Sequence, residues 1–349
     1  MTPSRLLTEA LAKPRCLAGY RTDEWNAVIR VARKEMLLGT LAARAENIEV
    51  LPKAGLILDE ARLVADVSQK AALYEVRQMT VALAEIGITP VLMKGSAYLS
   101  ADLSPLPGRN IGDLDIMVAE ADLSAAEAAL KARGWHSVKA KGSYDDAYYR
   151  KHMHELPPLA HRTRGGVVDL HHTILPKTAR LTPDAAAMLA DAVPTPEGVL
   201  MLAQADMVLH CATHLAYDGD FSGGLRNLWD LDRLVRQFAN DAFWTGLQSR
   251  AVHHDLVAPL GLSLRLARDL YGTPSPESLR ASCDIVDRLA LSKLRSHDRF
   301  GRTQAPISSF LLYMRGHWLR MPPLMLTRHL LTKWRAERAE ARREVQTRT

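Results

Sequence analysis

Two aspartates one residue apart carry the clearest chemical signal in this sequence. Asp113 and Asp115 flank Leu114 and lead into the apolar residues Ile116 and Val118, a pattern that favours a strand. Side chains two residues apart in a strand point to the same face, which would place the two carboxylates about 6–7 Å apart. Carboxylates this close repel each other unless one is protonated or a cation lies between them.

A second group of polar residues precedes the aspartates. Lys94-Gly95-Ser96 ends an apolar run that begins at Val91. Glycine allows a close approach of the backbone to a ligand, and a turn that opens a helix offers free N–H groups to an anion. Mg²⁺ is usually bound by one or two carboxylates together with substrate phosphates. The stretch from Val91 to Val118 therefore predicts a magnesium–triphosphate site.

These residues resemble a known signature. Gly95-Ser96 followed by Asp113-x-Asp115 is similar to the motif of the DNA polymerase β-type nucleotidyltransferase superfamily. The wider pattern resembles its bacterial "uncharacterised nucleotidyltransferase" family, and the matching residues are Lys94, Gly95, Ser96, Arg109, Asp113 and Asp115. The spacer between Gly95 and Asp113 is longer than in many polymerase β-type enzymes, but it suits the narrower family, in which an Arg-containing loop fills the gap.

Asp169 is the predicted third carboxylate. It lies inside the apolar run Val167 to Leu170, where an acid is costly unless it is paired or bound to a metal. The resemblance implies that Asp113, Asp115 and Asp169 are catalytic and hold two Mg²⁺ ions, for which Mn²⁺ is a substitute, with an NTP such as ATP as substrate. Asp169 would also take the proton of the acceptor. The alternatives are an exposed acidic turn for the Asp-x-Asp pair and a solvent-facing strand edge for Asp169.

Four further residues are expected to contact the nucleotide. Ser96 and the N–H groups near Gly95 would bind phosphate oxygens, and Lys94 and Arg109 would neutralise phosphate charge. The alternative is that Lys94 is a strand-end cation and Arg109 a loop charge. Alternation places His171 on the same face as Asp169, where it would contact phosphate or acceptor, or act as a structural histidine.

Three other features give weaker signals. His210 and His214 lie four residues apart, the spacing of a zinc pair on a helix, but no third ligand is close in the sequence. Arg226 and Asp230 have the spacing of an i,i+4 ion pair. In the resembled family this region packs near the active site, so Arg226 or His214 would face the nucleotide. Tyr98 is expected in the core.

Three segments are predicted around these residues, with an α+β fold overall. Residues 1–87 form a helical N-terminal cap, residues 88–182 form a small mixed-sheet nucleotidyltransferase core, and residues 183–349 form a C-terminal helical domain with a basic tail. The core reads β-α-β-α-β-β-β, with a hairpin at Gly165-Gly166. Helices are expected at 22–46, 56–86, 97–102, 122–133, 197–216, 224–238, 241–251, 254–271, 276–297, 306–316 and 323–346, strands at 91–93, 111–118, 135–140, 156–162 and 167–172, and a loop at 141–146.

Composition narrows the class of protein. The chain has 349 residues, of which 47% are hydrophobic and 24% charged, the values of a soluble globular protein. Its three cysteines are far apart and predict no disulfide framework, which favours the cytoplasm. The N-terminus lacks a signal-peptide core, and no apolar run is long enough to cross a membrane.

The net charge of +6 is concentrated at the end of the chain. Residues 327–349 contain seven Arg or Lys and three Glu, a net charge of +4. This basic tail predicts weak contact with a polyanion or an anionic membrane surface, or a terminal helix with a solvated basic end. A nucleic-acid-binding body would carry its basic stripe on the fold itself.

The predicted function is Mg²⁺-dependent transfer of an NMP from an NTP to a hydroxyl or phosphate acceptor, with release of pyrophosphate. The alternative is a catalytically silent member of the same fold that senses nucleotide or binds another protein. A kinase-like or phosphohydrolase activity ranks last, because the sequence has no Walker motif. No motif identifies the acceptor.

Overall fold

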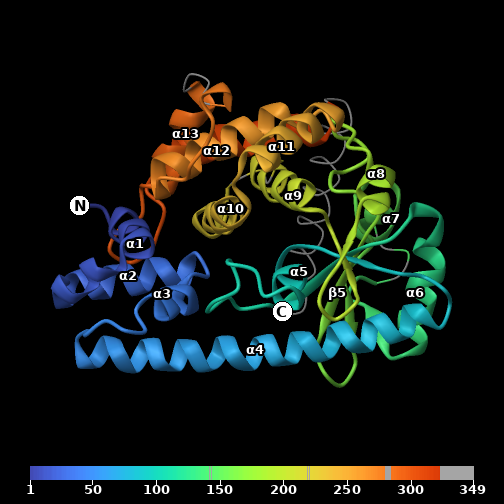
Figure 1. The fold of residues 1–349 in the computed structure, drawn as a ribbon, viewed down its shortest axis with the longest axis horizontal. Helices are drawn as coiled ribbons and strands as arrows, with labels where there is room; N and C mark the ends of the chain where they lie inside the picture. The colour runs from blue at the N-terminus through green and yellow to red at the C-terminus, as the bar shows by residue number, and fades with distance from the viewer. Residues whose placement is uncertain (141, 143, 218, 220, 280–283, 323–349) are drawn as a thin grey trace, which may run out of the picture.

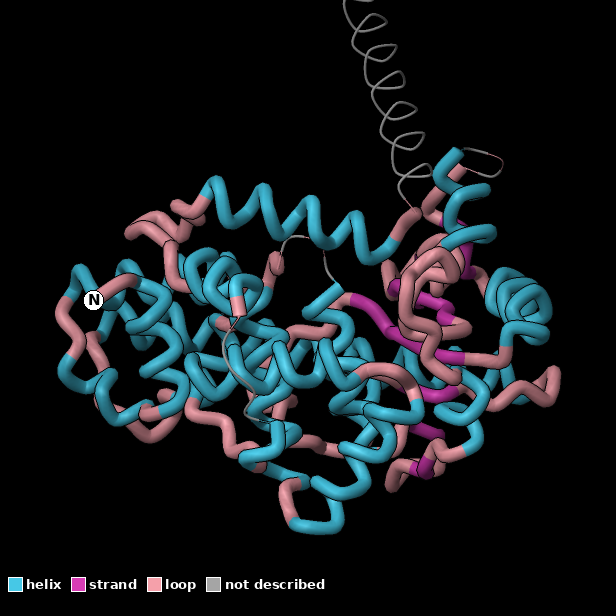
Figure 2. The backbone as a smooth tube through the Cα atoms, turned by 90° about the horizontal axis from the view of Figure 1, so that it is seen from above, coloured by secondary structure: helices cyan, strands magenta, loops and turns pink. Residues whose placement is uncertain are grey.

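The computed structural model describes the whole chain except residues 141, 143, 218, 220, 280–283 and 323–349. Helices at both ends of the chain enclose a small sheet that lies toward one end of the molecule (Figures 1 and 2). The predicted helix 323–346 and the basic tail lie outside the described residues. Among the described helices, none is long and apolar enough to cross a membrane.

The N-terminal segment is helical, as the sequence predicts, but the helix predicted over 22–46 is two separate helices, and the first helix of the chain was not among those predicted. The bounds of these helices are α1 (Pro3–Ala12), α2 (Thr22–Lys34), α3 (Leu38–Arg44) and α4 (Pro52–Ala84), with a 3₁₀ turn at Pro14–Gly19. At the start of α2, the Glu24 carboxylate accepts a hydrogen bond from the N–H of Arg21, which satisfies one of the free N–H groups there. Helix α4 has 33 residues and joins the N-terminal helices to the sheet (Figure 1).

Seven strands form one mixed sheet in the order β3-β4-β5-β2-β1-β7-β6. Their bounds are β1 (Val91–Leu92), β2 (Asp113–Met117), β3 (Trp135–Ser137), β4 (Leu159–His161), β5 (Val167–His171), β6 (Val193–Pro194) and β7 (Leu200–Met201). Strands β2 and β5 are parallel, as are β1 and β7, whereas the other neighbours are antiparallel. The predicted hairpin is confirmed: β4 and β5 pair across the turn that contains Gly165.

Three helices accompany the sheet. Helix α5 (Lys94–Ser100) packs on β2, α6 (Leu123–Ala132) packs on β3, and α4 contacts both helices as well as β2. Helix α7 (Tyr144–His152) corrects the predicted loop at 141–146, which overlaps its first residues. Its polar sequence carries acids in the first turn and bases in the last, so its charges complement the helix dipole although its apolar periodicity is weak.

The sheet also extends past residue 182, the predicted end of the core. The helix predicted from residue 197 begins only at Gln204, because Thr195 and Val199 close a turn (N···O 2.7 Å) between β6 and β7. Pro196, next to Thr195, suits the first turn of a helix, but it fits this turn equally well. Pairing of β7 with β1 adds β6 and β7 to the sheet.

The remaining elements of the described chain are helices. They are α8 (Ala185–Ala190), α9 (Gln204–Tyr217), α10 (Gly224–Phe238), α11 (Asp241–His253), α12 (Val257–Tyr271), α13 (Ile285–Leu294) and α14 (Pro306–Arg320). The helix predicted over 276–297 is a 3₁₀ turn at Glu277–Leu279 and the separate α13. Helix α12 packs against α1, so the N-terminal helices contact the C-terminal helices.

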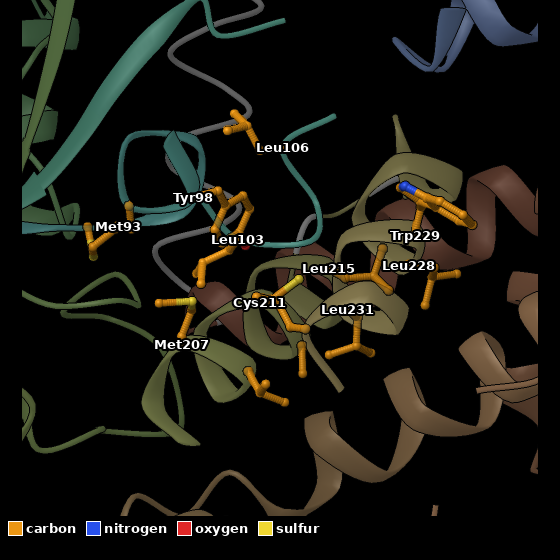
Figure 3. Close-up of a cluster of buried hydrophobic side chains, with 14 of the residues drawn as sticks. Met93, Tyr98, Leu103, Leu106, Met207, Cys211, Leu215, Leu228, Trp229 and Leu231 are labelled. Carbon is orange, nitrogen blue, oxygen red and sulfur yellow. The ribbon is translucent and has the colours of Figure 1, made fainter. Parts of the chain in front are cut away.

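A hydrophobic cluster joins the sheet region to the C-terminal helices (Figure 3). Met93 and Tyr98 come from the β1–α5 region, whereas Met207, Cys211 and Leu228 come from α9 and α10. All five are buried, so separating the two regions would expose apolar surface to water. This packing fixes α9 and α10 beside the predicted nucleotide residues, and Tyr98 lies in the core as expected.

Candidate functional site

Strand pairing brings the three predicted aspartates together on β2 and β5, two neighbouring strands in the middle of the sheet. Asp115 on β2 pairs in register with Asp169 on the parallel strand β5, and Asp113 pairs with Val167. Residues paired in this way project to the same face of a sheet, and alternation adds Asp113 to that face. Asp115 is buried, Asp169 is half-buried and Asp113 is exposed. The predicted carboxylate cluster therefore exists, and it opens to solvent at Asp113.

Asp115 has two side-chain partners, an ammonium group and an imidazole. Its Oδ1 lies 2.7 Å from Nζ of Lys94 and 3.1 Å from Nε2 of His171. Burial opposes ionisation of Asp115, but Lys94 and His171 outweigh it and hold the pKa of the carboxyl well below its usual range. Lys94 opens α5 with a φ of 44°, a costly conformation for a non-glycine residue that often marks a functional site.

Asp169 has the opposite environment. Burial and the negative charges of Glu155 and Asp115 raise its pKa to about 7. Its Oδ1 is buried and has no hydrogen-bond partner among the described residues. A buried carboxylate oxygen with no donor is unfavourable, and a cation beside it would remove that cost. The donor set of Asp113 and Asp169, together with Asp115, thus fits the hard oxygen ligands that Mg²⁺ takes.

Two residues of this cluster were not predicted. Glu155 contacts Nε2 of His171 (3.2 Å), and its carboxylate also lies 3.7 Å from Nε2 of His154. Both residues follow α7, in a segment that the sequence leaves without an assigned element. The available signal was the adjacent His-Glu pair directly before an apolar run, but only the tertiary structure places it against β5.

A cavity of about 150 Å³ adjoins the aspartates. Its lining combines cations with acids and aromatic or apolar groups, and comprises Lys94, Gly95, Tyr98, Arg109, Asn110, Ile111, Gly112, Asp113, Asp115, Cys211, His214, Arg226, Asn227 and Asp230. Loop 109–113 and α5 form one side, while α9 and α10 form the other. The cavity therefore lies between the sheet region and the C-terminal helices.

Arg109 is held in place by a buried ion pair with Asp230 of α10. The guanidinium also lies over the ring of Tyr98, 5.3 Å from its centroid. The predicted ion pair between Arg226 and Asp230 is wrong, because Arg109 from the distant loop takes that carboxylate. Sequence spacing alone favours the local i,i+4 pair, but the fold brings Arg109 to the buried side of the helix. Whether Arg109 also contacts phosphate stays a prediction.

Arg226 lines the cavity instead. Its Nε is buried without a hydrogen-bond partner among the described residues, and its Nη1 donates a hydrogen bond to the sulfur of Met36, at 3.5 Å. Burial and the charge of Arg109 lower the pKa of Arg226, which is the response of a cation that lacks a full counter-charge. An anion in the cavity would supply that charge.

Gly95 and Ser96 differ in their placement. Gly95 lines the cavity, and a Cβ added there would lie 3.4 Å from Nε of Arg109. Ser96 is buried, and its Oγ lies 2.7 Å from the carbonyl oxygen of Met93 and 2.9 Å from that of Asp115. The hydroxyl thus joins the start of α5 to β2, and Ser96 is not among the residues that line the cavity. Its predicted contact with phosphate is not supported by this arrangement.

The two histidines on α9 lie in different surroundings. His214 lines the cavity, where the positive charge of Lys94 together with burial lowers its pKa to about 3. His210 is buried, and its ring centroid lies 6.4 Å from that of His214. Among the described residues, the metal-competent group of three or more ligands is a different one, formed by His154, Glu155 and His171.

Together these features define a class of protein. A small mixed sheet presents three carboxylates beside a cation-lined cavity, an arrangement suited to handling phosphate groups and divalent cations. Comparison with family models gives the particular family: the model described as "Uncharacterised nucleotidyltransferase" matches residues 21–272. The chain belongs to this family, as the sequence motif predicts.

Two other comparisons add little. Among solved structures, an antigenic nucleotidyltransferase-like protein from Paracoccidioides brasiliensis is similar, with 16% sequence identity and a TM-score of 0.27. The similarity covers 57% of this chain and 91% of that protein. No curated protein matches the sequence.

Proposed function

We propose that this protein transfers a nucleoside monophosphate from an NTP to a hydroxyl or phosphate acceptor and releases pyrophosphate. The main observation is the in-register pairing of Asp115 with Asp169 beside a cation-lined cavity. The match to the nucleotidyltransferase family over residues 21–272 supports the reaction class.

Asp113, Asp115 and Asp169 would hold Mg²⁺. When bound, the ions would neutralise charge on the phosphates and lower the pKa of the attacking hydroxyl. The unpartnered Oδ1 of Asp169 supports this assignment. Lys94 now neutralises Asp115 from 2.7 Å, so cation binding requires that its ammonium group turns toward another anion.

Other residues of the cavity would bind and orient the substrate. Arg226 has a buried Nε without a partner and would contact the triphosphate. Lys94 would turn from Asp115 to the same phosphates. Asp169 would accept the proton of the acceptor hydroxyl, the role of a general base.

The test is transfer of label from each of four α-labelled NTPs, with Mg²⁺ or Mn²⁺ and a cell extract as the source of acceptors. We expect transfer by the wild type and a loss of at least about a hundredfold in Asp113→Asn. Asp66→Asn is the control, because Asp66 is an exposed carboxylate on α4. Equal transfer by wild type and Asp113→Asn would exclude the proposed site.

One observation favours a second candidate, a nucleotide-binding member without turnover. The ion pair with Lys94 gives the buried Asp115 a counter-charge from the protein itself. Such a protein would be stabilised by NTP but would transfer no label to any acceptor in the extract. Label transfer that depends on Asp113 would rule this candidate out.

A further inference from the structure

A group of three ligand-type residues next to the aspartates is not used in the proposed transfer. His154 and Glu155 precede β4, and His171 is the last residue of β5. Glu155 and His171 form an antiparallel bridge, with hydrogen bonds on both sides of it, from Leu156 N–H to the Leu170 carbonyl (2.9 Å) and from His172 N–H to the His154 carbonyl (3.0 Å). The backbone therefore holds all three residues in fixed positions.

Their ligand atoms have nearly the separations that a tetrahedral metal ion requires. Oε2 of Glu155 lies 3.2 Å from Nε2 of His171 and 3.7 Å from Nε2 of His154, and the three ligand atoms lie within 4.8 Å of one another. Metal–ligand bonds of about 2.0–2.1 Å in tetrahedral geometry place ligand atoms about 3.3 Å apart. Small side-chain rotations would complete this geometry.

The chemistry of the three groups also fits a metal ion. Nε2 of His171 is close to two carboxylates, at 3.1 Å from Asp115 and 3.2 Å from Glu155, and a single N–H cannot donate a linear hydrogen bond to both. The imidazole of His154 lies beside that of His171, with ring centroids 5.2 Å apart. Neither ring has a hydrogen-bond partner at Nδ1 among the described residues, so neither is locked against rotation.

We propose that His154, Glu155 and His171 form a metal site for a transition-metal ion of the Zn²⁺ class. Two imidazoles and one carboxylate are a donor set that such ions prefer and that Mg²⁺ does not. The site differs from the proposed magnesium site in its ligands, and it does not depend on nucleotidyl transfer. Asp115 lies at the border of both sites, so an ion bound here would compete with Lys94 for that carboxylate.

The test uses the full chain, stripped of metal with a chelator and titrated with Co²⁺, whose visible absorption reports tetrahedral coordination. We expect one equivalent to bind, Zn²⁺ to displace it, and excess Mg²⁺ to leave it bound. Affinity should fall at least about tenfold in His154→Ala and in the nearly isosteric Glu155→Gln. His152→Ala is the matched control, because His152 is nearby but is not one of the three ligands.

The outcomes separate this site from the proposed active site. Binding that persists in Asp113→Asn and disappears in Glu155→Gln supports the proposal, even if no nucleotidyl transfer is found. Co²⁺ binding that survives both His154→Ala and Glu155→Gln, or no binding by the wild type, would overturn it. Circular dichroism of each variant checks that loss of binding is not loss of fold.

A separate observation concerns the solvent-facing side of α4, which lies along the edge of the molecule (Figure 1). Six large apolar side chains on this helix are strongly exposed. Val64 (50%) lies off the stripe that the other five form, which are Leu56 (72%), Leu63 (65%), Val67 (59%), Tyr74 (51%) and Val81 (49%). They recur at intervals of seven and four residues, the spacing of a coiled-coil seam. Exposed Glu60, Lys70 and Arg77 occupy the remaining positions of this seam.

The seam is complementary to itself when two copies run antiparallel about the middle of α4. In this register, Leu56 of one copy faces Val81 of the other, Leu63 faces Tyr74, and Val67 faces the alkyl chain of Lys70. Glu60 of each copy then faces Arg77 of the other, so the charges at these positions are opposite. Arg77 already pairs with Glu197 through an exposed contact of 3.3 Å, which is weak enough to be exchanged. We infer that α4 forms a two-fold dimer interface between copies of this chain.

Sedimentation of the full chain over a range of concentrations tests the interface. We expect a dimer for the wild type, a monomer for Leu63→Glu, and weakened association for Glu60→Arg. The double variant Glu60→Arg/Arg77→Glu should recover the dimer, because it restores opposite charges across the two-fold axis. A monomeric wild type, or a dimer that Leu63→Glu leaves intact, would overturn the inference.

Discussion

At the scale of single residues, the buried ion pair between Arg109 and Asp230 determines how the cavity is held. Both side chains are less than a tenth exposed, and each needs the other because an unpaired buried charge is costly. The pair also connects the loop that precedes β2 to α10. Its effect on function is therefore indirect, since it fixes the position of the loop that carries Asp113.

Asp230→Leu is predicted to lower the free energy of unfolding by about 3–5 kcal/mol, because it leaves Arg109 buried without a counter-charge. The double variant Arg109→Met/Asp230→Leu should recover most of that loss, since two apolar side chains can pack where the ions were. Urea unfolding followed by tryptophan fluorescence measures both. A double variant less stable than Asp230→Leu would contradict this account.

At the scale of elements, the close approach of two backbone segments positions the same loop. Gly39 of α3 and Gly108 face each other so closely that a Cβ on Gly108 would lie 2.0 Å from the carbonyl oxygen of Gly39. Gly108 also has a φ of 70°, which other residues rarely adopt. Both properties require glycine at a position next to Arg109.

Gly108→Ala is predicted to destabilise the protein by more than the roughly 1–2 kcal/mol that positive φ alone costs, because the backbone must also shift. Gly87→Ala is the matched control: Gly87 has a φ of 72°, but a Cβ there meets nothing within 4 Å. Thermal unfolding of the two variants gives the comparison. Equal melting temperatures would show that the contact with Gly39 does not matter.

Helix α7, which the sequence did not predict, is anchored to α6 by charge. Arg150 donates hydrogen bonds to both carboxylate oxygens of Glu127, at 2.8 and 2.9 Å, and Lys131 adds a third at 2.6 Å. These hydrogen bonds, from Arg150 above all, outweigh partial burial and lower the pKa of Glu127 from 4.5 to about 2.

Glu127→Gln is predicted to cost about 1.5–3 kcal/mol of unfolding free energy at pH 7. Because the pKa is lower in the folded state, this contribution is fully present above about pH 5 and is lost as the pH falls toward 2. Denaturant unfolding of wild type and variant across this range should show the difference shrink. Glu120→Gln is the control, since the Glu120 side chain is 63% exposed in its ion pair with Lys177 and should contribute little.

At the scale of the whole molecule, the cavity lies between the sheet region and the C-terminal helices, and residues of both regions line it. Lys94 and Arg109 come from one side and Arg226 and Asp230 from the other. A ligand that contacts both sides would stabilise the assembled molecule, since it binds only where the two regions are together.

An NTP is therefore predicted to raise the melting temperature, and the gain at a hundredfold excess over Kd corresponds to about 2.7 kcal/mol. Arg226→Met should remove most of this gain, while its melting temperature without nucleotide should change little, because Arg226 forms no ion pair with a described residue. Differential scanning fluorimetry measures both quantities. A full gain in Arg226→Met would remove Arg226 from the nucleotide site.

Local patterns in the sequence predicted most of the elements and much of the carboxylate cluster. Alternation placed Asp113 and Asp115 on one strand face, and the apolar run around Asp169 predicted its strand, because both depend only on neighbours along the chain. The family motif could be found for the same reason, because its residues lie close together along the chain. The weakly amphipathic α7 and the two-residue strands β6 and β7 were missed, because polar helices and very short strands have little periodicity of their own.

Only the tertiary structure decided which distant residues meet. Arg109 pairs with Asp230, 121 positions away, instead of the local Arg226, and this exchange leaves Arg226 directed to the cavity. Glu155 and His154 join His171 through a backbone bridge to the end of β5. The sequence contains all of these residues, but their partners depend on strand register and helix packing, which are fixed by burial of the whole core and not by spacing along the chain.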